Sequence, residues 1–177
     1  MKYTISKDTV THQGIILRRV IAVEDFGSIK AGDRGGFIEW QGNLSQLGTA
    51  WVDDDAIVSG SAGVFDDAMI FGYAWISGNA HVSRKARVYG NARVLGNTVV
   101  TDYANVSGNA VVAGKARIVD DAWVAGYAMV VDFGRVRGKA QVSGRALVYD
   151  TGSVSGDEKV SGDTMVCGHT DVSGQPK

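Results

Sequence analysis

A six-residue repeat is the feature that most constrains how this chain can fold. The stretch ARVYGNARVLGN, residues 86–97, contains one pattern twice: Ala, a variable residue, Val, a variable residue, then Gly-Asn. In frame with Ala86, the pattern runs without insertion from residue 44 to residue 175, which is 132 residues or 22 hexads. The third position is Val or Ile in every hexad except the first, which has Gln46.

The spacing of the repeat predicts a short strand followed by a corner. Positions one and three lie two residues apart, so on a strand they share a face, while positions two and four point the other way. Positions five and six carry Gly, Asn and Asp, which form turns. A helix is excluded because six residues do not match the 3.6-residue period, and each helical Gly would cost about 1 kcal/mol. We therefore expect Val106 and Val112 to be buried and Asn105 and Val111 to point outward.

These hexads resemble those of the hexapeptide-repeat, left-handed parallel β-helix proteins, in which three hexads form one triangular coil. The segment DFGSIKAGDRGGFIEWQGNLSQLGTAWV, residues 25–52, is similar to the YdcK-type solenoid proteins of bacterial and phage genomes. The resemblance implies an all-β fold, a single-stranded left-handed parallel β-helix of about seven coils. Periodicity alone does not set the hand of the coil.

The repeat also divides the chain. Residues 44–175 are expected to form one continuous solenoid, and residues 1–43, which lie outside the repeat, an N-terminal β cap. A cap is expected because the open end of a solenoid exposes a sheet edge.

Composition narrows the range of partners and compartments. The chain has 18 basic and 19 acidic residues, net charge −1, which argues against binding nucleic acid through overall charge. The single cysteine, Cys167, excludes an intrachain disulfide and favours a reducing compartment. Neither a signal-like N-terminus nor a run of ~18 apolar residues is present, so a cytoplasmic protein without membrane contact is expected.

Sorting the hexads by threes places an apolar row on one outer face. A second face shows Trp51, Met69 and Arg87 outward, and the third shows Gly63, His81 and Val99. Exposed apolar surface of this length marks an interaction site. We expect a homo-oligomer, a dimer in preference to a trimer; a different protein partner, plain exposure and coverage by the cap are the alternatives. The expected interface residues are Trp75, Leu95, Val111, Met129, Val131, Leu147, Tyr149, Met165 and Cys167.

A basic patch is expected on adjacent rungs, formed by Lys115, Arg117, Arg135, Arg137 and Lys139. Such a patch could bind phosphate or an acidic partner, but a solvated charged surface is the preferred interpretation. Nucleic acid is not the expected partner, because no aromatic residue is interleaved and Asp120 and Asp121 lie beside the patch. The paired aspartates lack the spacing of known calcium loops, so no metal site is expected.

Catalysis has one weak candidate. Many relatives in the wider hexapeptide family are acyltransferases that use a His general base, which makes His81 the residue to consider. Its expected rung neighbours, Gly63 and Val99, offer no carboxylate to orient the ring. No loop interrupts the repeat to enclose a cofactor, so no cofactor is expected. We therefore expect a non-catalytic binding or scaffold protein. A phage- or prophage-encoded inhibitor of a host defence protein is the first alternative, and an acyltransferase the second.

Overall fold

The computed structural model describes residues 1–174, and nearly all of its regular structure is β. A long sheet contains β1 (Tyr3–His12), β2 (Ile15–Ala22), β3 (Arg34–Ile38), β5 (Ile57–Val58), β8 (Trp75–Ile76), β11 (Arg93–Val94), β14 (Val111–Val112), β17 (Met129–Val130), β20 (Leu147–Val148) and β23 (Met165–Val166). One 3-10 helix, η1 (Gln41–Asn43), precedes the first complete coil.

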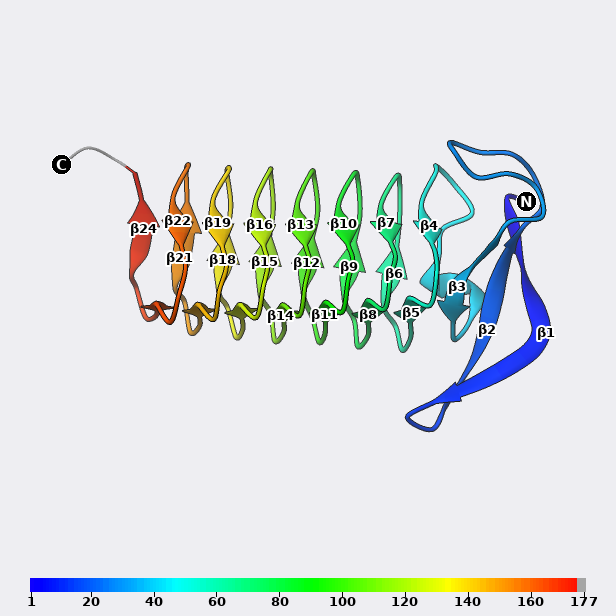
Figure 1. Cartoon of the computed structure of the whole chain (residues 1–177), viewed down its shortest axis with the longest axis horizontal. Helices are drawn as coiled ribbons and strands as arrows, with labels where there is room; N and C mark the ends of the chain where they lie inside the picture. Colours follow the sequence, from blue (N-terminus) through cyan, green and yellow to red (C-terminus); the bar gives the residue numbers. More distant parts are fainter. Residues whose placement is uncertain (175–177) are drawn as a thin grey trace.

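Two further sheets complete the coil. The second contains β4 (Trp51–Val52), β7 (Met69–Ile70), β10 (Arg87–Val88), β13 (Asn105–Val106), β16 (Trp123–Val124), β19 (Gln141–Val142) and β22 (Lys159–Val160). The third contains β6 (Gly63–Val64), β9 (His81–Val82), β12 (Val99–Val100), β15 (Arg117–Ile118), β18 (Arg135–Val136), β21 (Ser153–Ser155) and β24 (Asp171–Ser173). Figure 1 shows the turns stacked side by side along the molecule.

The expected parallel β-solenoid is confirmed, and it has one more turn than the hexads alone predict. Consecutive rungs pair in parallel, as Val94 with Val112 and Val112 with Val130. The long sheet holds eight such parallel strands, because β3 already pairs in parallel with β5. Since β3 precedes the first hexad, the repeat gives no sign of this extra rung.

The facing of the hexads is also as predicted. Val106 and Val112 are fully buried, whereas Asn105 and Val111 are partly exposed. The Ala and Val side chains at positions one and three form one continuous core along the coil. Removing this apolar surface from water stabilises the coil, at about 25 cal/mol per Å².

The corners explain why the fifth position accepts Gly or Asp. The backbone there has positive φ, for example 68° at Gly108 and 61° at Asp120. Asp tolerates this conformation better than most residues with a Cβ. The Asp120 carboxylate also accepts a hydrogen bond from the backbone N–H of Gly138, one rung on, at 2.9 Å. Asp66 accepts one from Arg84 in the same way, at 3.0 Å.

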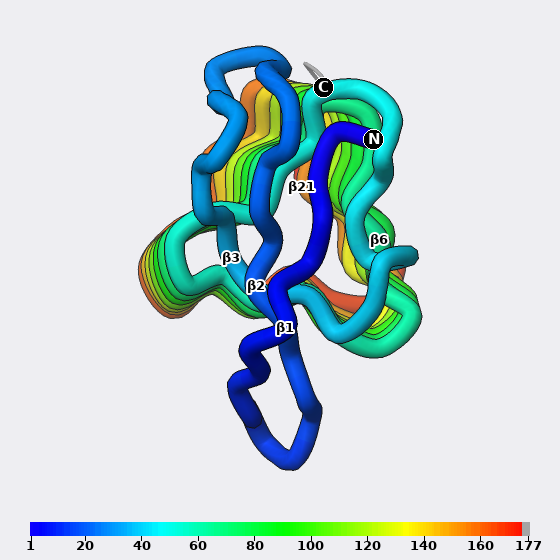
Figure 2. The backbone as a smooth tube through the Cα atoms, turned by 90° about the vertical axis from the view of Figure 1, so that its right-hand side faces the viewer, coloured from blue at the N-terminus to red at the C-terminus, as the bar shows by residue number. Residues whose placement is uncertain are grey.

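The N-terminal segment adds a hairpin to the long sheet. β1 pairs antiparallel with β2, and β2 pairs antiparallel with β3. Figure 2 shows the hairpin lying across the N-terminal end of the coil. In both views its tip, residues 12–15, projects beyond the cross-section of the coil.

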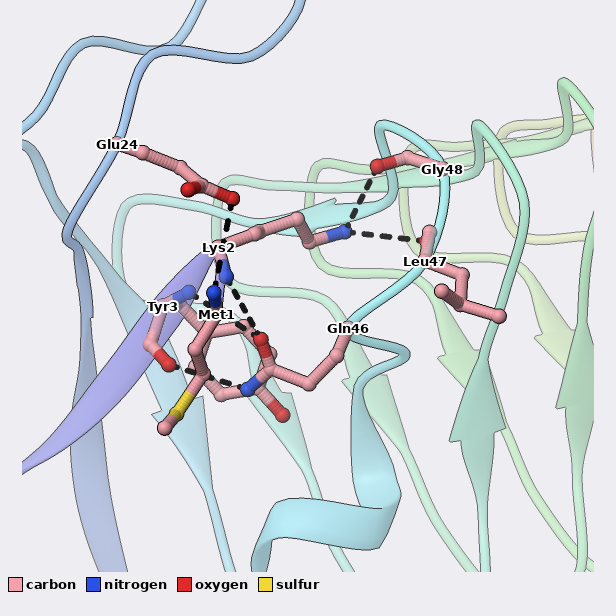
Figure 3. Close-up of polar contacts among 7 residues, drawn as sticks. All are labelled: Met1, Lys2, Tyr3, Glu24, Gln46, Leu47 and Gly48. Carbon is pink, nitrogen blue, oxygen red and sulfur yellow. Dashed lines mark hydrogen bonds and ion pairs between the residues drawn. The ribbon is translucent and has the colours of Figure 1, made fainter.

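Lys2 and Tyr3 are buried against the start of the coil, where they make polar contacts with residues 46–48 (Figure 3). The Lys2 ammonium is buried and donates to the backbone oxygen of Ala50 at 2.8 Å and, at longer range, to Leu47 and Gly48. Burial lowers the pKa of Lys2 to about 8. The Tyr3 hydroxyl donates to the Leu44 oxygen at 2.6 Å, and burial raises the pKa of Tyr3 to about 12.

One outward position departs from the repeat. The phase of the hexads places Trp51 outward, yet its side chain is fully buried. The reason is the segment between β2 and β3, which covers this end of the second sheet: the Phe26 ring lies edge-on to Trp51 with 5.4 Å between centroids. The N-terminal segment therefore covers outer surface as well as the end of the core.

Candidate interaction surface

The outward side chains of the long sheet form an apolar face. Parallel pairing stacks Trp75, Arg93, Val111, Met129, Leu147 and Met165 directly on one another. Two residues further along each hexad lie Leu95, Ala113, Val131, Tyr149 and Cys167, all half-buried. The equivalent stacks on the other sheets are richer in polar side chains, including Arg117 next to Arg135 and Gln141 next to Lys159. All nine residues expected at the interface thus lie on one face.

This face has a covered end, formed by the β5 and β8 rungs. The His12 ring, at the hairpin tip, lies edge-on to Trp75 with 5.1 Å between centroids. From the adjacent rung, the Arg93 guanidinium lies 5.0 Å from the centre of the Trp75 ring system. The indole N–H of Trp75 donates to the Ser59 hydroxyl at 3.2 Å. Trp75 is therefore held by this molecule's own side chains.

The remaining rungs, β11, β14, β17, β20 and β23, form an open stretch. Met129 is 42% exposed and Met165 is 60% exposed. Tyr127 and Phe133, at the two corners that flank the Met129 rung, are also well exposed. Near the far end, the side chain of Cys167 raises the pKa of the neighbouring Tyr149 hydroxyl. The open stretch is thus both apolar and accessible.

The five residues of the predicted basic patch lie together on the third sheet and its corners, and all are exposed. Arg117, Arg135 and Arg137 line one shallow hollow of about 280 Å³. Arg137 lies 3.6 Å from the Asp171 carboxylate, and the Lys115 ammonium lies over the Phe133 ring at 5.2 Å. The hollow is basic, but part of its charge is already paired.

The candidate general base, His81, stands in an exposed stack. Its strand neighbours are Gly63 and Val99, as expected from the hexad phase. The ring stacks on Phe65 with 4.6 Å between centroids and 22° between planes. Among residues 1–174, no hydrogen bond to the His81 side chain orients the ring. A general base needs such a partner or a substrate to fix the reactive nitrogen.

Two other kinds of site are absent from the described part of the chain. Residues 1–174 contain no group of three or more His, Cys, Asp or Glu placed to hold a metal ion. Over the same residues, no helix has the length and apolar character needed to cross a membrane.

Sequence reasoning missed the contact between His12 and Trp75. His12 lies outside the repeat and 63 positions before Trp75, so no periodicity connects them. The exposed Val10 and Ile16 on the hairpin were missed for the same reason. Only the alternative in which the cap folds over the apolar face pointed in this direction.

Comparison with known proteins supports the repeat. A family model described as the YdcK beta solenoid repeat matches residues 86–102. The chain is also 36% identical over 63 residues to a protein of Escherichia coli strain K12 named "Uncharacterized acetyltransferase YdcK". This match covers 35% of the chain and 19% of the relative's length. The chain is thus a hexapeptide-repeat β-solenoid that resembles the YdcK-type solenoids.

Proposed function

We propose that this protein is a non-catalytic scaffold that forms a homodimer through the open stretch of its apolar face. The observation that carries the proposal is the accessible apolar row from Val111 to Met165. Leaving such surface in water has a cost of about 25 cal/mol per Å². The largest apolar patch of a monomer is often functional for this reason.

A second copy of the chain is the occupant that fits best. The face is a flat ladder of short parallel strands, and its outward side chains are mostly small or flexible. A two-fold interface covers the same patch on both subunits, so a closed dimer leaves no copy of the open stretch exposed. The projecting hairpin favours two subunits over three, because three parallel coils around one axis would bring three hairpin tips together at that axis.

Light scattering on purified protein tests this proposal. We expect the mass of a dimer at tens of micromolar. Met129→Arg combined with Leu147→Glu should give a folded monomer, because neither side chain belongs to the core. Trp123→Arg, on the second sheet and 44% exposed, is the matched control and should remain dimeric.

A monomeric wild-type protein would overturn the homodimer. A different protein on the open stretch would then become the leading explanation, including a host protein bound by a phage-encoded chain. It would be tested by co-purification with wild type and with the charged double variant.

The named relative supports a second candidate, acyl transfer. Its printed name describes an acetyltransferase, and the resemblance makes acetyl-CoA the donor to test. Transfer of acetyl from acetyl-CoA to an acceptor, abolished by His81→Ala, would establish this function and overturn the non-catalytic proposal. We expect no transfer, and we expect His81→Ala to leave the fold and the dimer unchanged.

A further inference from the structure

We infer that the two coils of the dimer run antiparallel, with the two-fold axis at the Met129 rung and each hairpin against the end of the other coil. This inference rests on the proposed homodimer and specifies its register. Three independent features of the molecule support it: the projecting hairpin, the sizes of the outward side chains, and the charges at the ends of the open stretch.

The hairpin determines the direction of the second coil. A flat two-fold dimer can hold its coils parallel, with equal rungs opposite one another, or antiparallel. In the parallel arrangement, both hairpin tips project over the β5 and β8 rungs toward the other subunit and occupy the same space. In the antiparallel arrangement, each tip lies beyond the last described rung of the other coil. The hairpin therefore selects the antiparallel dimer.

The same overhang determines the position of the axis. The hairpin tip lies against Trp75 of the β8 rung, so a second coil can contact the rungs from β11 to β23. The middle rung of these five is β17, which carries Met129. An axis there keeps the two coils in contact over the whole open stretch. An axis further toward β23 shortens the contact, and one nearer β8 drives the second coil into the hairpin.

Side-chain sizes are complementary about the Met129 rung. With the axis there, β14 lies opposite β20 of the second copy, so Ala113 faces Tyr149 and Val111 faces Leu147. One rung further out, Leu95 faces Cys167. Each of these positions brings a larger side chain against a smaller one, which lets two flat surfaces interdigitate without voids.

Charge is complementary at the ends of the open stretch. The Arg93 side chain is exposed and lies opposite Met165 of the second copy. Asp163, at the corner two residues before Met165, is exposed as well. In residues 1–174, Asp163 forms no ion pair of its own, whereas in the dimer it lies beside the incoming Arg93. The two-fold axis forms this pair twice.

The exposed side chains of the hairpin add contact area that the dimer needs. Five rungs at ~4.8 Å and a face ~17 Å wide give a footprint of roughly 400 Å² on each copy, about half of a standard interface. Val10 is 42% exposed and, by strand alternation, lies on the same side of the hairpin as His12. In the antiparallel dimer, this side of the hairpin meets the end of the second coil.

Cross-linking of single cysteines tests the register. In a Cys167→Ser background, Met129→Cys should cross-link to itself through a short bis-maleimide. Val111→Cys and Leu147→Cys should cross-link mainly when the two proteins are mixed. Trp123→Cys, on the second sheet, is the control and should not react across the dimer.

A charge reversal gives a second, independent readout. Arg93→Asp should weaken the dimer at least tenfold, and adding Asp163→Arg should restore the affinity to within about threefold of wild type. Lys159→Asp, on the second sheet, is the control for added negative charge. A dimer in which Val111→Cys alone cross-links best, or in which Asp163→Arg gives no rescue, overturns this register and leaves self-association in place. A wild-type monomer overturns both proposals.

Discussion

The covered end and the open stretch of the apolar face have the same hexad positions but different surroundings. Trp75, at the covered end, contacts His12 and Arg93 and donates a hydrogen bond to Ser59. Met129, three rungs away in the same stack, is 42% exposed. The repeat makes the two positions equivalent, and the non-repeating hairpin makes them different. An outward position in the solenoid is therefore either a structural contact or part of an accessible surface, depending on whether the non-repeating segment covers it.

Truncating Trp75 and Met129 in turn should give the largest difference in the free energy of unfolding. Trp75→Ala removes an aromatic pair, a cation–π contact and a hydrogen bond, and should lower the free energy of unfolding by about 2–3 kcal/mol. Met129→Ala removes a side chain with little packing and should stay within about 0.5 kcal/mol. Both are measured by urea unfolding in a Leu147→Glu background, so that self-association does not enter the measured free energy. Equal losses at the two positions would mean that the hairpin does not hold Trp75 in solution.

The buried Lys2 has a smaller effect on the free energy of unfolding, and this effect depends on pH. Lys2 has a pKa of about 8 in the folded protein and the ordinary 10.5 when unfolded. Between these values the unfolded chain holds the extra proton, so stability rises with pH across this window. From pH 7 to pH 9.5, wild type should gain about 1–2 kcal/mol relative to Lys2→Met; the backbone carbonyls that accept from the ammonium reduce the full effect.

Unfolding of wild type and Lys2→Met at a series of pH values provides the measurement. Lys7→Met, at an exposed position on β1, controls for the loss of one positive charge. A difference between wild type and Lys2→Met that stays constant with pH would mean that Lys2 is not buried in solution. In wild type itself, the gain should reverse above pH 10, because Tyr3 keeps its proton to about pH 12 when folded but loses it near pH 10 when unfolded.

The sequence predicted the coil well because the facing of the residues in each hexad is determined within that hexad. Val106 and Val112 are buried as the phase requires, since alternation within a strand depends only on neighbouring residues. Trp51 departs from the same rule because Phe26, 25 residues earlier and outside the repeat, lies against it. The rung formed by β3 was missed because residues 34–38 lack the hexad pattern. Their place in the coil comes from parallel pairing with β5.

The candidate surface follows the same division. The phase of the hexads placed Val111, Met129, Leu147 and Met165 in one stack, as the structure has them. The role of that stack as an interface stays a prediction. The boundary between the covered end and the open stretch could not be predicted, because it depends on where a ten-residue strand, β1, directs its last residue.

The smallest predicted change in stability tests where the covered end stops. His12→Ala removes the ring that lies edge-on to Trp75 but leaves the Arg93 contact and the hydrogen bond to Ser59. An aromatic pair contributes about 0.5–1.5 kcal/mol beyond its buried area, and His12 is partly exposed, so we expect a loss of about 0.5–1 kcal/mol. Thr11→Ala, on the opposite side of the same strand, is the matched control and should change stability less. A double-mutant cycle with Trp75→Ala isolates the pair, because the cost of His12→Ala should largely vanish when Trp75 is absent. If instead the two losses simply add, the hairpin tip is held independently of the apolar face, and the boundary of the open stretch moves back to the β5 rung.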